Sequence, residues 1–334
     1  MGKTGRILVT GGAGYIGSHI VRLLVRSGRD VVVIDDLSEG HREAIAGVPL
    51  VEADFGNGAA LEQVLGGGGF EFVIHMAAFC EVGQSVNDPS AYYANNLTRS
   101  LTLLDAARRH GIRGLVFSST AAVYGEPEQV PIAEDHPTRP TNPYGETKRA
   151  VEQALHWYRR AYGLSYVALR YFNAAGAHPD SDIGEDHAPE THLIPRLLLA
   201  VLQDSEPTPI FGDDYPTPDG TCVRDYVHVV DLAQAHVLAL DTLEREELGG
   251  EQFNLGNGRG FSVREVVDTI ERVTGKRPAT RQAPRRAGDP AVLVASADRI
   301  TERLGWRAEF PALEQIVQTA WDWHRSHPRG YATP

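Results

Sequence analysis

The chain has 334 residues, of which 42% are apolar and 23% are charged, the proportions of an ordinary globular protein. Its formal net charge of −12 argues against binding nucleic acid through the overall field of the protein. With only Cys80 and Cys222 present, a disulfide framework and a cysteine zinc site are both disfavoured. No stretch approaches the roughly 18 apolar residues that span a bilayer, and the first apolar run is too short for a signal peptide, so we expect a cytoplasmic protein.

Short apolar runs alternate with amphipathic segments throughout the first half of the chain. Continuous apolar runs indicate strands buried on both faces, and the segments between them repeat their apolar residues at helical spacing. The strands are expected at 6–10, 30–36, 72–78, 114–120 and 165–173, and the helices at 16–28, 92–111 and 143–162. This alternation predicts a Rossmann-type α/β fold, a doubly wound parallel sheet with helices on both faces.

The character of the sequence changes after residue 173. Residues 174–222 are rich in Pro, Gly and Asp around one apolar helix at 193–202, and residues 223–240 return to a strand followed by a helix. We also expect a helix near 262–274, a strand near 291–295 and a last helix near 312–325. These patterns predict a nucleotide-binding domain and a smaller C-terminal α/β domain that binds the substrate. The first is expected to span 1–173 with a returning segment at about 223–248, and the second 174–222 and 249–334.

A glycine-rich loop, "TGGAGYIG" (10–17), lies directly between the first predicted strand and the first predicted helix. Gly11, Gly14 and Gly17 allow a tight turn, a close approach to a diphosphate, and packing of the helix against the sheet. The start of the helix then offers unpaired N–H groups and a partial positive charge. Its position in a strand–loop–helix unit makes this a specific signal for a dinucleotide.

Acidic and small residues at later strand ends extend this prediction. Asp35 and Asp36 end the second strand, about 20 residues beyond the glycines, where a carboxylate binds the adenosine ribose and repels a 2′-phosphate. This favours NAD over NADP. A further short strand is expected to end at "EADF" (52–55), where Asp54 suits either the adenine amino group or a solvated loop. In "HMAAFC" (75–80), at the end of the strand at 72–78, the small Ala77 and Ala78 leave room for the backbone to lie against the dinucleotide.

A tyrosine and a lysine stand four residues apart in "NPYGETK" (142–148). Asn142 is a good helix N-cap and Pro143 a good first helical residue, so Tyr144 and Lys148 share one face of a helix. An ammonium about 4 Å from the phenol would lower the phenol's pKa by about three units at an effective dielectric of 20. The phenol would then accept a proton from a substrate hydroxyl near neutral pH. The alternative is an ordinary surface pair.

A further hydroxyl is expected close to this pair. "SST" (118–120) ends a predicted parallel strand, which places Thr120 at the carboxyl edge of the sheet, where ligands bind in this fold. A bound nicotinamide, a tyrosine with a lysine partner, and a threonine hydroxyl together suit the oxidation of an alcohol.

Five segments of the second half complete a recognisable pattern: "YFNAAGAHP" (171–179), "THLIP" (191–195), "IFGDDYPTPDGTCVRDYVHV" (210–229), "NLGNG" (254–258) and "RRAGDP" (285–290). Together with the glycine-rich loop and the Tyr–Lys pair, the chain resembles the extended short-chain dehydrogenase/reductase family over essentially its whole length. Within that family it is similar to the enzymes that epimerise UDP-sugars. The segment at 210–229 is the most specific of these signals.

The resemblance implies a role for each matching residue. Tyr144 matches the catalytic base, Lys148 its partner, and Thr120 a hydroxyl that binds the sugar. The implied NAD contacts are Gly11, Gly14, Tyr15, Ile16, Gly17, Asp35, Asp36, Asp54, Phe55, Met76, Ala77, Ala78, Asn96, Tyr144, Lys148 and Phe172. The implied UDP-sugar contacts are Thr120, Asn173, His192, Leu193, Ile210, Phe211, Arg224, Arg286, Asp289 and Leu293. His192 stands where some relatives have asparagine, and Arg286 suits either a diphosphate or solvent.

The resemblance also implies a reaction, the interconversion of UDP-galactose and UDP-glucose. Tyr144 takes the proton of the sugar 4-hydroxyl while C4 gives a hydride to NAD. The 4-keto sugar then rotates and presents its other face to the cofactor. The hydride and the proton return to it, which gives the epimer inverted at C4. We expect no metal, because the reaction needs none and we see no cluster with metal-ligand spacing. Leu293 matches a position where a bulky residue is thought to exclude N-acetylated sugars, and leucine is intermediate in size.

Other functions stay open at this stage. One is an epimerase that also accepts UDP-N-acetylhexosamines. A nucleotide-sugar 4,6-dehydratase would need acidic groups beside Thr120, where "TAAVYG" (120–125) has two alanines. A simple dehydrogenase would release NADH, and a non-catalytic NAD sensor would not need the Tyr–Lys–Thr set.

The resemblance finally implies a homodimer through the helices at 92–111 and 143–162. The residues that suit such a contact, or equally a core, are Tyr92, Leu101, Leu104, Leu155 and Tyr158.

Overall fold

A computed structural model of the chain describes residues 5–203, 206–286 and 289–331. Its largest element is a seven-stranded sheet in which all neighbouring strands are parallel, in the order β10-β6-β5-β4-β1-β2-β3. The strands are β1 (Arg6–Thr10), β2 (Val31–Asp35), β3 (Leu50–Glu52), β4 (Phe70–His75), β5 (Gly114–Thr120), β6 (Ser165–Tyr171) and β10 (Glu251–Leu255). The chain order reverses between β1 and β4, as in a doubly wound sheet, and this confirms the predicted Rossmann-type fold.

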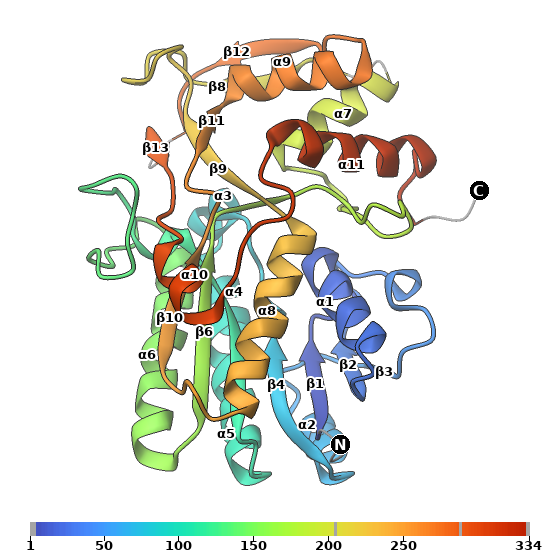
Figure 1. Cartoon of the computed structure of the whole chain (residues 1–334), viewed down its shortest axis with the longest axis vertical. Coiled ribbons are helices and arrows are strands. Elements are labelled where there is room, and N and C mark those ends of the chain that lie inside the picture. The colour runs from blue at the N-terminus through green and yellow to red at the C-terminus, as the bar shows by residue number, and fades with distance from the viewer. Residues whose placement is uncertain (1–4, 204–205, 287–288, 332–334) are drawn as a thin grey trace.

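Two hydrophobic clusters lie on the two faces of this sheet, beneath the helices that flank it in Figure 1. Side chains alternate along each strand, so Ile7 and Val9 join one cluster while Leu8 joins the other. The first face is covered by α1 (Tyr15–Arg26), α8 (Val229–Glu244) and α10 (Asp298–Leu304), and the second by α2 (Gly58–Gly66), α5 (Arg99–Arg109) and α6 (Pro143–Tyr162).

The helix expected at 92–111 is interrupted by a π-helical turn. It consists of α4 (Pro89–Tyr92), the π turn η2 (Tyr93–Thr98) and α5 (Arg99–Arg109), preceded by α3 (Val82–Asn87). Wide turns of this kind are frequent at functional sites, and this one carries Asn96. Two short 3₁₀ turns complete this half of the chain, η1 (Arg42–Ile45) and η3 (Ala121–Val123).

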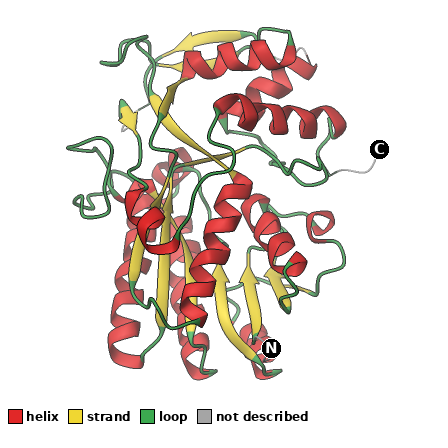
Figure 2. Cartoon of the chain, in the orientation of Figure 1, coloured by secondary structure: helices red, strands yellow, loops and turns green. Residues whose placement is uncertain are grey.

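The remaining strands form two small sheets beyond the carboxyl edge of the large one (Figure 2). In the first, β9 (Val223–His228) pairs with β7 (Asn173–Ala175), β11 (Gly260–Ser262) and β13 (Val292–Leu293); in the second, β8 (Thr208–Phe211) pairs with β12 (Thr280–Ala283). A third hydrophobic cluster packs them with α7 (Leu193–Gln203), α9 (Val263–Thr274) and α11 (Leu313–Ser326). No helix among the described residues is long and apolar enough to cross a membrane.

The structure corrects the expected returning segment at about 223–248. Helix α8 does cover the large sheet, but β9 before it belongs to a small sheet, where its partners include β7. The strand that returns is β10, which we had assigned to the substrate-binding part; it extends the large sheet beside β6, with Phe253 in register with Leu169. The division into cofactor and substrate domains stays a prediction.

Candidate active site

The loop between β1 and α1 is packed so tightly that only glycine fits at two positions. Gly11 has φ +66°, and a Cβ there would lie 2.6 Å from the backbone nitrogen of Ala77. A Cβ on Gly17 would lie 2.1 Å from the carbonyl oxygen of Gly11. The N-cap of α1, Gly14, provides no side-chain cap, so the first N–H groups of the helix are left for a ligand. This loop therefore fits the diphosphate of a dinucleotide.

Asp35 and Asp36 have different surroundings. The Asp35 carboxylate is buried and accepts hydrogen bonds from the backbone N–H groups of Ala13 and Leu37, both at 2.9 Å. A carboxylate has about four acceptor sites, so two are left for a ribose. Burial raises the pKa of Asp35 above its usual value. Asp36 is exposed and accepts instead from the N–H and hydroxyl of Ser38, so the structure brings only Asp35 against the loop.

The other predicted cofactor residues follow β3 and β4. Both oxygens of Asp54 are engaged, one by the backbone N–H of Gly56 at 2.7 Å and one by Arg99 at 3.0 Å. Asn96, on the π-helical turn, forms two hydrogen bonds of 2.9 Å with the backbone of Phe79. Asn96 therefore holds the segment after β4, which contains Met76, Ala77 and Ala78. Phe55 and Phe172 are buried, and Tyr15 and Ile16 begin α1.

The Tyr144–Lys148 pair lies inside the protein, not on its surface. Asn142 caps α6 by accepting the N–H of Gly145 at 2.9 Å. A Cβ on Gly145 would lie 2.5 Å from the carbonyl oxygen of Ala122, so the start of α6 lies close against the end of β5. Tyr144 is 8% exposed and Lys148 3%, and the ammonium donates a hydrogen bond of 2.8 Å to the Ser118 carbonyl.

The electrostatics of this pair differ from our expectation. Burial raises the pKa of the Tyr144 phenol well above its usual value, and a hydrogen bond with Thr120 lowers it by less. Burial also lowers the pKa of Lys148 to about 8. The ammonium nitrogen lies 6.0 Å from the centre of the Tyr144 ring. The phenol's pKa is thus raised where we expected it to be lowered, because burial opposes ionisation of the phenol.

Several polar residues around the pair were missed by the sequence analysis. Ser118 and Tyr171 share a hydrogen bond between their hydroxyls, beside Lys148. On the other side of β5, Ser119 donates to Glu152 at 2.5 Å, and Glu152 pairs with Arg170 at 2.6 Å, all three being buried. The strand "SST" could have predicted part of this arrangement. Side chains alternate along a strand, so Ser118 and Thr120 lie on one face and Ser119 lies on the other.

Three predicted substrate residues gather on the small sheets. Arg224, on β9, is buried and forms an ion pair with Asp289. Arg286 lies 3.3 Å from the same carboxylate, with its guanidinium 4.9 Å from the ring centre of Phe211. One aspartate thus holds two arginines, which suits a diphosphate when both point the same way. Residues 287 and 288 of the "RRAGDP" motif lie outside the described residues.

Leu293 connects this group to the Tyr144 region. On β13 it is in register with Arg224, and it packs against a cluster that contains Ala121 and Phe172. Leu193 and Ile210 pack together against a separate small cluster. Asn173, on β7, is exposed and in register with Tyr226 of β9.

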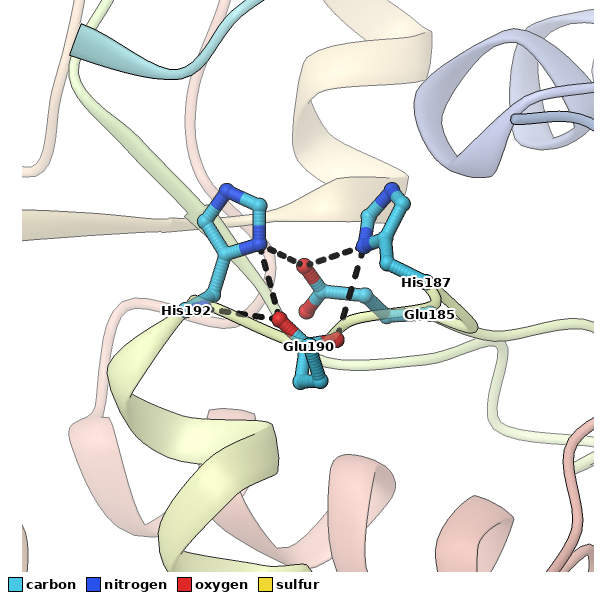
Figure 3. Close-up of side chains that lie close together, drawn as sticks. All are labelled: Glu185, His187, Glu190 and His192. Atoms are coloured by element: carbon cyan, nitrogen blue, oxygen red, sulfur yellow. Dashed lines mark hydrogen bonds and ion pairs between the residues drawn. The ribbon is translucent and has the colours of Figure 1, made fainter. Parts of the chain in front are cut away.

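His192 lies in a cluster that the sequence analysis missed. Its Nδ1 atom is 2.9 Å from Glu185 and 3.0 Å from Glu190, and the Nδ1 atom of His187 lies 3.5 and 3.4 Å from the same two carboxylates (Figure 3). These four residue types can all ligate a metal, and their ligand atoms lie within 4.8 Å of one another. Our statement that the sequence holds no cluster with metal-ligand spacing was therefore wrong. The spacing Glu-x-His-x-x-Glu-x-His could have revealed it.

Comparisons with known proteins agree with this geometry. The sequence profile of the NAD dependent epimerase/dehydratase family matches residues 7–256. The UDP-glucose 4-epimerase of Halalkalibacterium halodurans is 52% identical over 327 residues, 98% of each chain. The crystal structure of UDP-glucose 4-epimerase from Brucella ovis in complex with NAD has a TM-score of 0.92 and 47% identity, covering 95% of this chain and 98% of that one. The crystal structure of UDP-glucose 4-epimerase from Bifidobacterium longum in complex with NAD+ and UDP has a TM-score of 0.93 and 37% identity. The match covers 98% of this chain and 100% of that one. With its glycine-rich loop, its buried Tyr–Lys pair and a profile match over most of its length, the chain belongs to the NAD dependent epimerase/dehydratase family.

Proposed function

We propose that this protein interconverts UDP-galactose and UDP-glucose by transient NAD-dependent oxidation at C4 of the sugar. The observation that carries the proposal is the buried set of Tyr144, Lys148 and Thr120 where β5 ends and α6 begins. This set lies at the same edge of the sheet as the glycine-rich loop after β1. Close relatives named UDP-glucose 4-epimerase over 98% of both chains support the choice of substrate.

The cofactor residues are proposed from the geometry above. When bound, NAD supplies the hydride acceptor and a positive charge beside the phenol. The N-terminus of α1 binds its diphosphate, Asp35 binds the adenosine ribose, and Lys148 binds the nicotinamide ribose. Asp54 is proposed at the adenine, where it would have to share its oxygens with Gly56 and Arg99.

Tyr144 is proposed to move the proton. It accepts the proton of the 4-hydroxyl as the hydride leaves C4, and returns it after the keto sugar has turned over. Because burial raises the pKa of this phenol, a neighbouring positive charge must favour its ionised form, and the Lys148 ammonium, 6.0 Å from the ring centre, provides one. Thr120 orients the sugar by a hydrogen bond.

The UDP part is proposed to lie on the small sheets. Arg224 and Arg286 bind the diphosphate, and Asp289 between them sets their orientation. The remaining proposed contacts are Asn173, His192, Leu193, Ile210, Phe211 and Leu293. The cofactor part then comprises residues 1–173 with α8 and β10, and the UDP-sugar part comprises the other segments.

A second candidate function is the epimerisation of UDP-N-acetylhexosamines by the same site. Leu293 favours it, since this side chain of intermediate size packs beside Phe172 and lies in register with Arg224. A 4,6-dehydratase is less well supported, because Ala121 and Ala122 follow Thr120 and provide no acid or base.

One incubation separates an epimerase from a dehydrogenase and from a dehydratase. The purified chain is mixed with UDP-galactose, with and without added NAD, and the products are separated by chromatography. The proposal expects UDP-glucose and no net accumulation of NADH. A dehydrogenase would accumulate NADH absorbance, and a dehydratase would give a product lighter by one water. If no UDP-glucose forms even with added NAD, the proposal is wrong.

We also propose a homodimer through the helices that cover the second face of the sheet. Of the residues that suited either a contact or a core, Tyr92, Leu104 and Leu155 are buried in the chain itself. Leu101 is 37% exposed, and Trp157 and Tyr162 on α6 are 59% and 58% exposed. Light scattering should give twice the mass of the chain, and Trp157→Asp should shift it towards the monomer.

A further inference from the structure

The four side chains of Glu185, His187, Glu190 and His192 point towards a common centre, in the loop that leads to α7 (Figure 3). Glu185 is 4% exposed, so one of the two carboxylates is removed from water. The carboxylates of Glu185 and Glu190 each form ion pairs with both histidines. A buried carboxylate is costly unless a cation compensates it, so the identity of that cation matters.

The four distances between a histidine nitrogen and a carboxylate oxygen are close to those between the ligands of one metal ion. Zinc binds imidazole nitrogen and carboxylate oxygen at about 2.0–2.2 Å, and in a tetrahedral site the ligand atoms are therefore about 3.3–3.6 Å apart. The Nδ1 atom of His187 lies 3.5 and 3.4 Å from the two carboxylates, and that of His192 lies 2.9 and 3.0 Å from them. Each value is within about 0.5 Å of the tetrahedral spacing.

The hydrogen bonding of His187 is the second, independent observation. Its buried Nδ1 atom lies almost equally far from Glu185 and Glu190, yet forms a hydrogen bond with neither. A protonated imidazole would be expected to direct its N–H at one oxygen. An imidazole nitrogen that lies between two carboxylates in this way has the position of a metal ligand.

A second group of similar composition shows what an ordinary ion-pair cluster looks like here. His178 lies near Asp180 and Asp182, and their ligand atoms are also within 4.8 Å of one another. Those aspartates are exposed, however, and pair with Arg22 and Arg26. Their charge is thus compensated by arginines, which leaves no requirement for a metal.

We propose that Glu185, His187, Glu190 and His192 bind one divalent transition-metal ion, of which zinc fits the ligand set best. Two neutral imidazoles and two carboxylates neutralise a divalent ion and provide four ligands. The ion would act structurally. The His187 ring lies 6.5 Å from that of Tyr15 in edge-to-face contact, and His192 directly precedes α7, so the ion would fix this loop between the start of α1 and the start of α7.

The test measures metal binding directly on the full-length protein. The chain is stripped with a chelator, incubated with Zn²⁺, dialysed, and its metal content is counted by mass spectrometry. We expect one zinc per chain. Co²⁺ in place of zinc should give the intense visible absorption of a tetrahedral site. A chain that retains no zinc, or whose cobalt form lacks that absorption, overturns the proposal; the four residues would then form an ion-pair network only.

A matched pair of variants locates the ion. His187→Asn removes one of the four ligands. Loss of a residue that only hydrogen-bonds to a ligand weakens metal binding by roughly 10–100-fold, so loss of a ligand itself should weaken zinc binding by more. His178→Asn removes a histidine from the arginine-paired cluster and should bind zinc as the parent does. Equal binding by both variants would place the zinc elsewhere and contradict the proposal. If His187→Asn does not fold, the cobalt spectrum of the parent chain decides alone. None of these readouts depends on epimerase activity.

Discussion

Lys148, on α6 beside the end of β5, is 3% exposed, whereas the side chain of Arg286, proposed to contact the UDP diphosphate, is 61% exposed. The proposed cofactor residues are mostly held by the large sheet, because most of them lie at or just after the ends of β1, β2, β3, β4 and β6. The substrate residues are held across long sequence separations, as Asp289 holds Arg224. We therefore expect the proposed substrate residues to depend more on individual ion pairs than the proposed cofactor residues do.

Replacing Tyr144 should have the largest effect on activity. Tyr144→Phe keeps the buried ring and removes the group that we propose to move the proton, so kcat should fall by roughly 10²–10⁴-fold. Initial rates of UDP-glucose formation measure this. Tyr166→Phe is the matched control, since Tyr166 is a buried tyrosine at the opposite end of β6, hydrogen-bonded to Gln252. If Tyr144→Phe turns over at the parent rate, the proposed role of Tyr144 is wrong.

Two arginine variants compare an ion pair of the large sheet with an ion pair of the small sheets, in stability and in substrate binding. Arg170→Met leaves the buried carboxylate of Glu152 without its cation, and should lower the free energy of unfolding by about 3–5 kcal/mol. Arg224→Met should cost less stability, because Asp289 keeps Arg286 as a partner. It should instead raise KM for UDP-galactose by about 10–100-fold, which corresponds to about 1.4–2.7 kcal/mol, the range of a hydrogen bond to a charged group.

Urea unfolding and steady-state kinetics on both variants check this contrast. Equal losses of stability would show that the two ion pairs support the fold alike. An unchanged KM in Arg224→Met would remove this arginine from the proposed diphosphate site.

The pH dependence of stability should reveal the buried lysine. The pKa of Lys148 is about 8 in the folded protein, whereas a lysine exposed to water, as in the unfolded chain, has a pKa of 10.5. Between these values the unfolded chain holds more protons, so the contribution of Lys148 to the free energy of unfolding rises with pH, by at most about 3 kcal/mol. Lys148→Met should lack this rise. Urea unfolding of both proteins at pH 7.5 and pH 10 gives the difference, and a constant difference would contradict the burial effect.

Changing Leu293 should have the smallest effect and acts on specificity. Leu293→Ala removes volume beside Phe172 and should raise turnover of UDP-N-acetylgalactosamine relative to UDP-galactose several-fold, a change of about 1 kcal/mol. The ratio of kcat/KM for the two substrates measures it. An unchanged or lower ratio would show that Leu293 does not limit the space around the sugar.

The sequence predicted the large sheet well because its signals are local. The end of β5 at Thr120, and α6 from Pro143 to Tyr162, lie where the apolar runs and helix caps indicate. The π turn that carries Asn96 and the return of β10 were missed, because both depend on packing between distant segments.

The same limit applies to the candidate site. The burial of Tyr144 raises its pKa, and no helical spacing could show how little water reaches the phenol. The four residues from Glu185 to His192 are close in sequence, but only the folded loop turns their side chains to one point.

The most direct test of the proposed reaction uses UDP-galactose labelled with deuterium at C4. If the hydrogen leaves as a hydride to NAD held in the site and returns to the same carbon, the UDP-glucose formed in ordinary water keeps its deuterium at C4. A reaction that removed a proton from C4 would exchange it with solvent. Mass spectrometry or proton NMR of the product should show full retention, and replacement of the deuterium by solvent hydrogen would contradict the account.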